Sequence, residues 1–294
     1  MIEIKAPKLT FWRILLAAIW AVGIYAVLKR FTNGLGSVTH LSDEFPWGLW
    51  IGFDVLCGVA LAAGGFTITA GAYIFGFEEC KPIVRSSTLT AFLGYLLVCF
   101  ALLVDLGKPY NIWHPLVMWN PHSVMFEVAW CVMLYTTVLA LESSLFVFER
   151  LRLSKFYSLV KSVTFVLVVI GVILSTLHQS SLGSLFLIVP AKLSPLWYTP
   201  LLPLLFYISA IAAGIAMVIV ESHLSHRAFD RELESGLTVK LARISAWVLV
   251  VYFALKMTEI VRQGAFPLIF RLNYPSLLFL LEVGVGIADR KSVV

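Results

Sequence analysis

Long apolar runs recur along the whole sequence and constrain the fold more than any other feature. Each of seven runs is long enough to cross a bilayer as a helix, which takes about 20 residues, and an eighth run begins at Pro275. The seven runs are 11–31, 46–76, 84–105, 122–148, 157–178, 196–222 and 238–261. They are continuous and lack the alternation of apolar and polar positions that is typical of membrane strands. The sequence therefore predicts an all-α, polytopic transmembrane bundle with seven complete spans and a partial eighth.

The composition agrees with a membrane protein. Hydrophobic residues make up 60% of the chain and charged residues 13%, whereas a soluble domain carries about 25% charged residues. We find no internal repeat, low-complexity tract or soluble second domain, so residues 1–294 are expected to form one integral membrane domain. The net charge of +5 fits membrane topology and attraction to the anionic lipid of the bilayer, and it gives no reason to predict a nucleic-acid partner.

The basic residues are distributed unevenly between the two sides of the predicted bundle. The N-terminal segment and the connections after spans two, four and six hold 13 Lys and Arg residues, against six on the other side. Cytoplasmic loops are enriched in Lys and Arg, so the N-terminus is predicted to be cytoplasmic. The 13 are Lys5, Lys8, Arg13, Lys81, Arg85, Arg150, Arg152, Lys155, Lys161, Arg227, Arg231, Lys240 and Arg243.

Ionisable residues inside the spans gather in the predicted outer half of the membrane. They are Asp54, Asp105, Glu127, His178, Lys256, Glu259, Arg262 and Glu282. Glu142 and Glu221 are the exceptions and lie towards the cytoplasmic ends of their spans. A charged group at membrane depth costs about 2.5 to 3.5 kcal/mol and usually pairs or lines a cavity. The pattern predicts one shared polar site.

Structural explanations compete with this interpretation at some of these positions. Lys256, Glu259 and Arg262 are spaced i, i+3 and i+6, so they could neutralise one another as an ion-pair ladder. Asp105 closes a span and is better explained as an interfacial residue bonded to backbone. Asp54 and Glu127 have apolar neighbours on both sides, which favours a functional role.

The chain offers few ligands for redox centres of its own. A transmembrane b-type haem typically needs two histidines at membrane depth on facing helices, and all six histidines are predicted in loops or at span ends. Four scattered cysteines lack the spacing of iron–sulfur or zinc motifs and are expected to be small buried hydrophobes. We therefore predict no haem, no iron–sulfur cluster and no metal site in this chain. The run 62–65, Ala-Ala-Gly-Gly, is typical of close helix packing.

His178, Gln179 and Ser180 begin a run of hydrogen-bonding groups at the end of the predicted fifth span. A quinone head group needs donors to its two carbonyl oxygens and a supply of protons, and its tail needs an apolar path. His178 can donate or accept a hydrogen bond near neutral pH, and Glu127 or Asp54 could carry protons. A transporter site would use similar groups.

Several segments resemble one family of membrane subunits. The matching segments are 45–66 (FPWGLWIGFDVLCGVALAAGGF), 104–110 (VDLGKPY), 120–127 (NPHSVMFE), 140–142 (ALE) and 177–185 (LHQSSLGSL). In this order they resemble the HybB-type membrane subunits of hydrogenase-2 complexes, within the wider NrfD and polysulfide-reductase membrane-subunit family. Such subunits are often labelled b-type cytochromes, but the absent histidine pair argues against a haem here.

The resemblance implies a helical subunit of the prokaryotic cytoplasmic (inner) membrane. It would bind menaquinone or ubiquinone near the outer face, beside an iron–sulfur subunit that exchanges electrons with a catalytic subunit such as a NiFe hydrogenase. Applied residue by residue, the resemblance supports Glu127 as a proton donor and His178 as a quinone ligand most strongly. It gives the next strongest support to functional roles for Asp54, Asp105, Tyr110, Glu142 and Glu221. Quinone binding is thus assigned to His178, Gln179, Ser180, Asp54, Asp105 and Tyr110, and proton transfer to Glu127, Glu142, Glu221 and Asp54.

The sequence departs from the family at its C-terminus. HybB-type subunits continue for two further helices, so we expect this chain to be truncated there. The resulting hypothesis is a quinone-reactive membrane subunit of a respiratory oxidoreductase, with possible coupling to proton movement. The alternatives are a secondary transporter or ion-conducting subunit that uses the same carboxylates, and a purely structural anchor.

Overall fold

The computed structural model describes residues 10–42, 48–229 and 235–287, and within these ranges it is helical, with no strand. Seven stretches are long and apolar enough to cross a membrane: Phe11–Asn33, Leu49–Tyr73, Glu78–Asp105, Val124–Arg150, Ser154–Ile188, Leu202–Ala228 and Gly236–Arg262. A shorter apolar stretch, Tyr274–Gly284, follows them. The prediction of seven spans and a partial eighth is confirmed. Of the basic residues counted for orientation, Lys5, Lys8 and Arg231 lie outside the described residues.

The second span is not one regular helix. It consists of α2 (Leu49–Ile51), a π-helical segment (Gly52–Gly58), α3 (Val59–Ala62) and α4 (Gly64–Tyr73). The other elements are α1 (Phe11–Asn33), α5 (Lys81–Asp105), α6 (His114–Val117), α7 (Val124–Arg150), α8 (Ser154–Ile188), α9 (Leu202–Phe229), α10 (Ser235–Arg262) and α11 (Tyr274–Leu281), and a second π-helical segment, Glu282–Ile287, follows α11. π-helical turns are rare and are frequent at functional sites.

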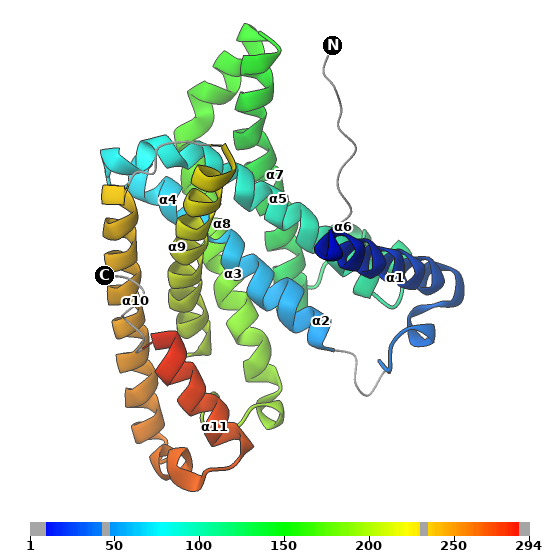
Figure 1. Ribbon diagram of the computed structural model, residues 1–294, viewed down its shortest axis with the longest axis vertical. Helices are drawn as coiled ribbons and strands as arrows, with labels where there is room; N and C mark the ends of the chain where they lie inside the picture. Colours follow the sequence, from blue (N-terminus) through cyan, green and yellow to red (C-terminus); the bar gives the residue numbers. More distant parts are fainter. Residues whose placement is uncertain (1–9, 43–47, 230–234, 288–294) are drawn as a thin grey trace.

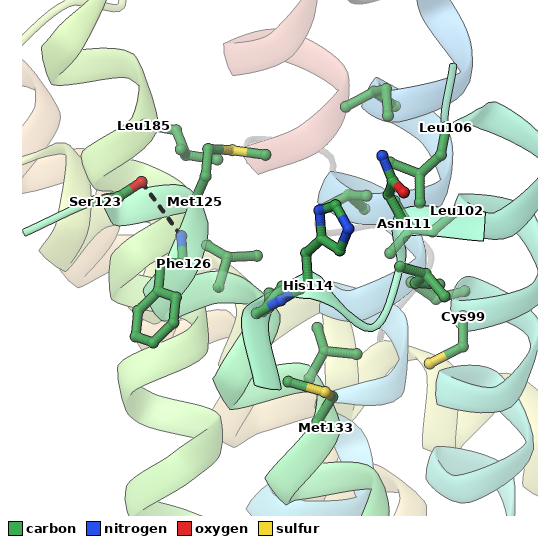
Figure 2. Close-up of a pocket in the computed structure, with 18 of the residues that line it drawn as sticks. Cys99, Leu102, Leu106, Asn111, His114, Ser123, Met125, Phe126, Met133 and Leu185 are labelled. Atoms are coloured by element: carbon green, nitrogen blue, oxygen red, sulfur yellow. Dashed lines mark hydrogen bonds between the residues drawn. The ribbon is translucent and has the colours of Figure 1, made fainter. Parts of the chain in front are cut away.

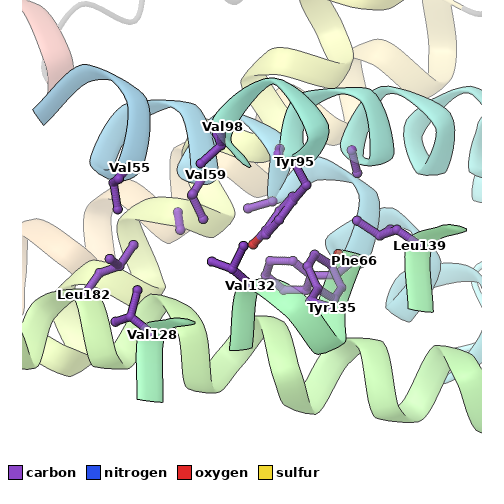
Figure 3. Packing of buried hydrophobic residues seen from close by; sticks show 14 of the residues in the cluster. Val55, Val59, Phe66, Tyr95, Val98, Val128, Val132, Tyr135, Leu139 and Leu182 are labelled. Carbon is purple, nitrogen blue, oxygen red and sulfur yellow. The ribbon is translucent and has the colours of Figure 1, made fainter. Parts of the chain in front are cut away.

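Helices α3, α4, α5, α7, α8 and α9 enclose the main core, while α10 packs on α9 and α11 lies beside α10 (Figure 1). The core is a cluster of buried apolar and aromatic side chains that includes Val59, Phe66, Tyr95, Tyr135 and Leu182 (Figure 3). In a bilayer the lipid supplies no net hydrophobic force between helices, so this close packing is a main source of cohesion.

Helix α1 lies apart from the main bundle in Figure 1. Arg30 is the single buried residue of this helix. The Arg30 guanidinium donates hydrogen bonds from Nε to the Val104 carbonyl and from Nη2 to the Leu106 carbonyl. These carbonyls lie at the C-terminal end of α5, where backbone acceptors lack helical partners and a cation is favoured.

Glycines allow the core helices to approach closely. A Cβ atom built on Gly214 of α9 would lie 2.3 Å from the Gly64 nitrogen of α4, and one built on Gly183 of α8 would lie 2.6 Å from the Leu202 carbonyl oxygen. A Cβ on Gly65 would lie 2.4 Å from the Ala91 Cβ of α5. The prediction that the run 62–65 serves close helix packing is confirmed.

The fifth span is longer than the sequence predicted. The predicted run ended at residue 178, whereas α8 continues to Ile188. His178 therefore lies inside a helix and is fully buried, so its predicted place at a span end is wrong. The polar residues after it do not end the helix, because their hydroxyls bond the carbonyls one turn earlier: Ser180 to Thr176, Ser181 to Leu177 and Ser184 to Ser180.

Candidate functional site

A cavity of about 680 Å³ lies between the second span, α5, α7 and α8, at the end of the bundle where residues 106–123 connect α5 to α7 (Figure 2). Its walls are largely apolar and come from four elements. They include Ile51, Val55 and Leu56 from the second span, Val98 and Leu102 from α5, Phe126, Val128 and Val132 from α7, and Leu185 and Phe186 from α8. Because Val55 and Leu56 belong to the first π-helical segment, the irregular part of the second span forms one wall.

The polar side chains of the cavity lining come from one connection. They are Lys108, Asn111, His114, Asn120 and Ser123. Ser123 is the N-cap of α7, since its hydroxyl accepts the Phe126 N–H at 3.4 Å. In the view of Figure 2, His114 and Asn111 lie between Leu185 on one side and Leu102 on the other. The cavity thus combines an apolar interior with hydrogen-bonding groups along one edge.

A buried polar pair lies behind the cavity wall. The Tyr95 hydroxyl and the His178 Nδ1 atom are 2.9 Å apart and hydrogen-bonded, and both side chains are fully buried. The Tyr135 ring meets Tyr95 edge to face at 4.7 Å between ring centroids. Figure 3 shows Tyr95 reaching from α5 toward Val132 and Tyr135 of α7. Val132 also lines the cavity and belongs to the same buried cluster as Tyr95 and Tyr135, so the cavity wall is continuous with the packing around the pair.

Unsatisfied polar atoms cluster around this pair. The His178 Nε2, Tyr135 hydroxyl and Ser175 hydroxyl are buried and have no hydrogen-bond partner among the described residues. Buried polar groups without partners are uncommon and call for an explanation such as water or a catalytic role. Three of them lie on the adjoining helices α7 and α8, beside the Tyr95–His178 pair.

None of the predicted quinone ligands lines the large cavity. Gln179 is buried and its Nε2 donates to the Val59 carbonyl at 3.3 Å, and the Ser180 hydroxyl donates to the Thr176 carbonyl at 2.6 Å. Tyr110 is 69% exposed. Gln179 and Ser180 thus make hydrogen bonds that stabilise the bundle, and Tyr110 lies at the surface.

Asp54 and Asp105 meet each other beside the cavity. Their side chains interact, and Arg30 is close enough to Asp105 to act on it electrostatically. Asp105 Oδ2 is buried without a hydrogen-bond partner among the described residues, which does not fit the backbone-bonded role expected for Asp105. Asp54 lines a separate groove of about 220 Å³, which Thr90 of α5 also lines.

Glu127 lies in the first turn of α7, where the positive end of the helix dipole favours a carboxylate. It is exposed and does not line the cavity, although its neighbours Phe126 and Val128 do. Its apolar neighbours in the sequence therefore did not indicate burial. At helical spacing, Glu127 shares one side of α7 with Cys131, Tyr135 and Glu142.

The two carboxylates predicted towards the cytoplasmic ends lie apart from the large cavity. Glu142 lines a different cavity, of about 450 Å³, at the other end of α7. Glu221 is half-buried on α9 next to Thr90, and its Oε2 atom has no hydrogen-bond partner among the described residues.

The remaining ionisable residues form a separate network on α10 and α11. Lys256 Nζ is 2.6 Å from Glu282 Oε1, which also accepts from Tyr252, while the Trp197 indole donates to Oε2 at 2.8 Å. Glu259 pairs instead with Arg262 at 3.2 Å and accepts from Thr199. The predicted ion-pair ladder is thus confirmed for Glu259 and Arg262. It is wrong for Lys256, whose partner Glu282 lies on another helical segment. The prediction of one shared polar site is wrong, since these residues surround a different apolar cluster.

Sequence reasoning missed the five polar residues of the cavity edge. The available signal was their density within residues 106–123, a connection that also holds several aromatic side chains and three prolines. Connections often carry binding residues on a rigid scaffold.

The histidines do not fit a bis-histidine haem. Among the described residues, His178 is the single histidine that is fully buried, and its Nδ1 atom is already bonded to Tyr95. No group of three or more metal-ligating side chains gathers in the same part of the chain, and the cysteines are free. Cys57 is exposed and Cys99 half-buried, so the prediction of buried cysteines holds fully for Cys80 and Cys131 alone.

Comparison with known proteins decides the family. The model of the family described as polysulphide reductase, NrfD, matches residues 37–288. The chain belongs to the NrfD family. With its seven apolar helices this identifies a multi-pass integral membrane protein, consistent with the inner membrane. No solved structure matches the chain.

NrfD-family relatives are similar over most of the chain. A protein of Nitratidesulfovibrio vulgaris is 42% identical, covering 92% of this chain and 75% of its own length. The probable Ni/Fe-hydrogenase 2 b-type cytochrome subunit of Escherichia coli is 34% identical over 87% of this chain and 67% of its own length. The menaquinone reductase integral membrane subunit of N. vulgaris is 30% identical, over 86% of this chain and 62% of its own length. The relatives thus include membrane subunits of respiratory oxidoreductases.

Proposed function

We propose that this NrfD-family chain is the quinone-reactive membrane subunit of a respiratory oxidoreductase, and that the 680 Å³ cavity receives the quinone. The observation that carries the proposal is the make-up of the cavity, with apolar walls from four elements and polar side chains along one edge. A quinone has the same division, since two carbonyl oxygens sit on a head group that continues into an apolar tail. The name of one relative, the menaquinone reductase integral membrane subunit, favours menaquinone.

The polar edge supplies the recognition chemistry. His114 and Asn111 can donate hydrogen bonds to a carbonyl oxygen, and Lys108 brings a positive charge that no ion pair with a described residue neutralises. Donors aimed at an oxygen that gains negative charge during reduction stabilise that charge most in a site from which water is excluded. We therefore assign quinone binding first to His114, Asn111 and Lys108.

Protons must reach the quinone together with electrons, because reduction to the quinol takes up two of each. The hydrogen-bonded pair Tyr95 and His178 lies behind the cavity wall, where Val132 belongs both to the lining and to the cluster that holds Tyr95, and each member of the pair can pass a proton. In this proposal His178 acts in proton transfer behind the wall and Glu127 acts at the start of α7. Asp54, Glu142 and Glu221 stand as further proton-transfer candidates.

Electrons would be exchanged with an iron–sulfur partner, and through it with a catalytic subunit such as a NiFe hydrogenase. This follows the hydrogenase-2 relative and the lack of a ligand set for a redox metal among the described residues. The polar edge belongs to a connection at the end of the bundle, where a partner bound at that surface would come close to the quinone.

The alternative function, a secondary transporter or ion-conducting subunit, would need carboxylates gathered around one binding site. Asp54 and Glu142 line two different cavities, and neither lines the 680 Å³ cavity. The dispersion of the carboxylates weighs against this alternative.

The test is quinone-analogue turnover by the purified complex with its electron-transfer partners. His114→Ala is expected to raise the KM for the analogue by about 2- to 13-fold, the worth of one hydrogen bond of about 0.5 to 1.5 kcal/mol. His122→Ala is the matched control, because His122 lies on the same connection but is exposed and does not line the cavity. His178→Ala and Glu127→Gln are expected to lower kcat.

Two outcomes would refute the proposal. One is turnover that is unchanged in both His114→Ala and His178→Ala, and the other is an equal effect of His122→Ala. An absorption spectrum of the isolated subunit tests the haem prediction separately, and a Soret band with a reducible α-peak would contradict it.

A further inference from the structure

A second large cavity lies at the opposite end of α7 from the proposed quinone site. It measures about 450 Å³ and is enclosed by the end of α4, the start of α5, the end of α7 and the start of α8. Arg85 and Lys161 line it together with Glu142, the tyrosines Tyr73 and Tyr157, and apolar side chains such as Phe146 and Phe165. Neither the family nor the names of the relatives assign a ligand to it.

The two cations of this cavity are held against aromatic rings. The Arg85 guanidinium carbon lies 5.8 Å from the Phe146 ring centroid, and the Lys161 Nζ atom lies 5.4 Å from the Tyr157 ring centroid. Arg85 also pairs with Glu149 at 3.2 Å. Lys161 makes no ion pair with a described residue, so its ammonium group is available to a bound anion.

The surroundings of the cavity are positive as well. Residues 142–161, which form the turn between α7 and α8 and the adjoining helix ends, contain four cations and two carboxylates. The cations are Arg150, Arg152, Lys155 and Lys161, and the carboxylates are Glu142 and Glu149. This hairpin projects beyond the ends of α9 and α10 in Figure 1. The distribution of Lys and Arg predicts that this end faces the cytoplasm, where the leaflet is rich in anionic lipid.

The carboxylate in the lining sits away from the charged entrance. Glu142 also lines a narrow void beside Tyr135 and Gly171, further into the bundle. It therefore marks the inner end of the cavity. Arg85 lies in the first turns of α5 and Lys161 in the second turn of α8, near the helix ends that bound the cavity.

These features favour a phospholipid over a small soluble anion. Arginine and lysine at helix ends match a phosphate group, and basic pockets between transmembrane helices are typical sites for anionic head groups. The apolar members of the lining suit the glycerol end of the acyl chains, and Phe165, which is 59% exposed, extends this apolar surface to the outside of the bundle.

We propose that this cavity binds the phosphate head group of an anionic phospholipid, held by Arg85 and Lys161 at the cytoplasmic end of α5 and α8. The lipid would fill the space between α5 and the α7–α8 hairpin and fix their spacing. The proposal does not depend on the proposed quinone function, because the two cavities share no lining residue.

The experiment measures lipid retention by the purified full-length chain in detergent, using native mass spectrometry and thermal unfolding. Phosphatidylglycerol, phosphatidylcholine and inorganic phosphate are added in separate arms. The test variant is Arg85→Gln/Lys161→Gln. The matched control is Arg150→Gln/Lys155→Gln, which removes the same charge from the α7–α8 hairpin at positions that do not line the cavity. Thr164→Trp fills the cavity without a change of charge.

Phosphatidylglycerol is expected to bind and stabilise the wild-type chain more than phosphatidylcholine does, and inorganic phosphate is expected to have no effect. The test variant should bind phosphatidylglycerol about 30-fold more weakly, at about 1 kcal/mol for each basic residue, Thr164→Trp should also lose binding, and the control should keep it.

Equal losses in the test and control variants would overturn the proposal, because they indicate diffuse attraction. So would stabilisation by inorganic phosphate alone, or a wild-type chain that does not distinguish the two lipids. The wild-type comparison stays decisive if a variant fails to fold.

Discussion

Replacing Gly214 by alanine probes the contact between α4 and α9. The added Cβ would lie 2.3 Å from the Gly64 nitrogen and 2.6 Å from the Ala63 carbonyl carbon, whereas ordinary contacts begin at 3.4 Å. All the nearest atoms belong to backbone, which cannot rotate away as a side chain can. The two helices would have to separate by about 1.1 Å at this point, the difference between 3.4 and 2.3 Å.

Overpacking of a well-packed core costs about 1 to 3 kcal/mol. At about 2 to 4 °C per kcal/mol for a domain of 150 to 250 residues, Gly214→Ala is expected to lower Tm by about 2 to 12 °C. The loss should exceed any gain from helix propensity, which favours alanine over glycine by about 1 kcal/mol. The measurement is thermal unfolding of the purified chain in detergent, followed by tryptophan fluorescence.

Gly23→Ala is the matched control, because Gly23 also lies inside an apolar helix but, apart from its chain neighbours and the backbone of its own helix, no described atom lies within 4 Å of the position that its added Cβ would take. Its Tm should stay the same or rise. A Gly214→Ala chain that melts at or above the wild-type temperature would refute the reasoning, since it would mean that α4 and α9 do not cross at these glycines.

Three further predictions concern charges and orientation. Lys256→Met removes the cation that faces Glu282 and should lower the free energy of unfolding by about 3 kcal/mol. In a double-mutant cycle, adding Glu282→Gln should recover part of the lost Tm. Additive losses of Tm would contradict the ion pair. Arg30→Ala should speed hydrogen exchange at the C-terminal end of α5, since hydrogen bonds from a charged group contribute about 1.5 to 3 kcal/mol; unchanged exchange would exclude this contact. With the native cysteines replaced, an impermeant maleimide should label Leu151→Cys from the cytoplasmic side and Ile112→Cys from the outer side, and the reverse pattern would contradict a cytoplasmic N-terminus.

The number and type of the spans could be read from the sequence, because the bilayer imposes one requirement on every span. A crossing helix must be apolar and about 20 residues long, and a sliding count of apolar residues detects this directly. The role of Gly64 and Gly65 was also predictable, since small residues inside a span have little use other than close packing.

The end of the fifth span was not predictable in this way. Ser180, Ser181 and Ser184 resemble a polar connection, but their hydroxyls bond carbonyls of their own helix, and Gly183 lets the backbone approach α9. Burial of these residues depends on neighbouring helices, which hydropathy does not include. His178 was therefore predicted at the end of a span, whereas it lies inside α8 and is fully buried.

The candidate site was harder to predict because it depends on which side of a helix each residue occupies. Glu127 and Phe126 are adjacent in the sequence, yet Phe126 lines the cavity and Glu127 is exposed. The partner of Lys256 lies 26 residues away on another helix, where spacing along one helix cannot reveal it. The ionisable residues were found, but their grouping required the tertiary structure.

The contact of Arg30 with the end of α5 also has a consequence for the order of membrane insertion. Arg30 is separated from its first carbonyl acceptor by 74 residues, which at about 5 to 20 residues per second corresponds to about 4 to 15 s of synthesis. During this interval α1 is already long enough to span the bilayer, while its arginine has no partner and must keep its charge at the water interface, as long basic side chains near helix ends do. The first helix therefore joins the bundle only after the third span has emerged, and the docking of Arg30 marks the moment at which the N-terminal part of the protein is assembled.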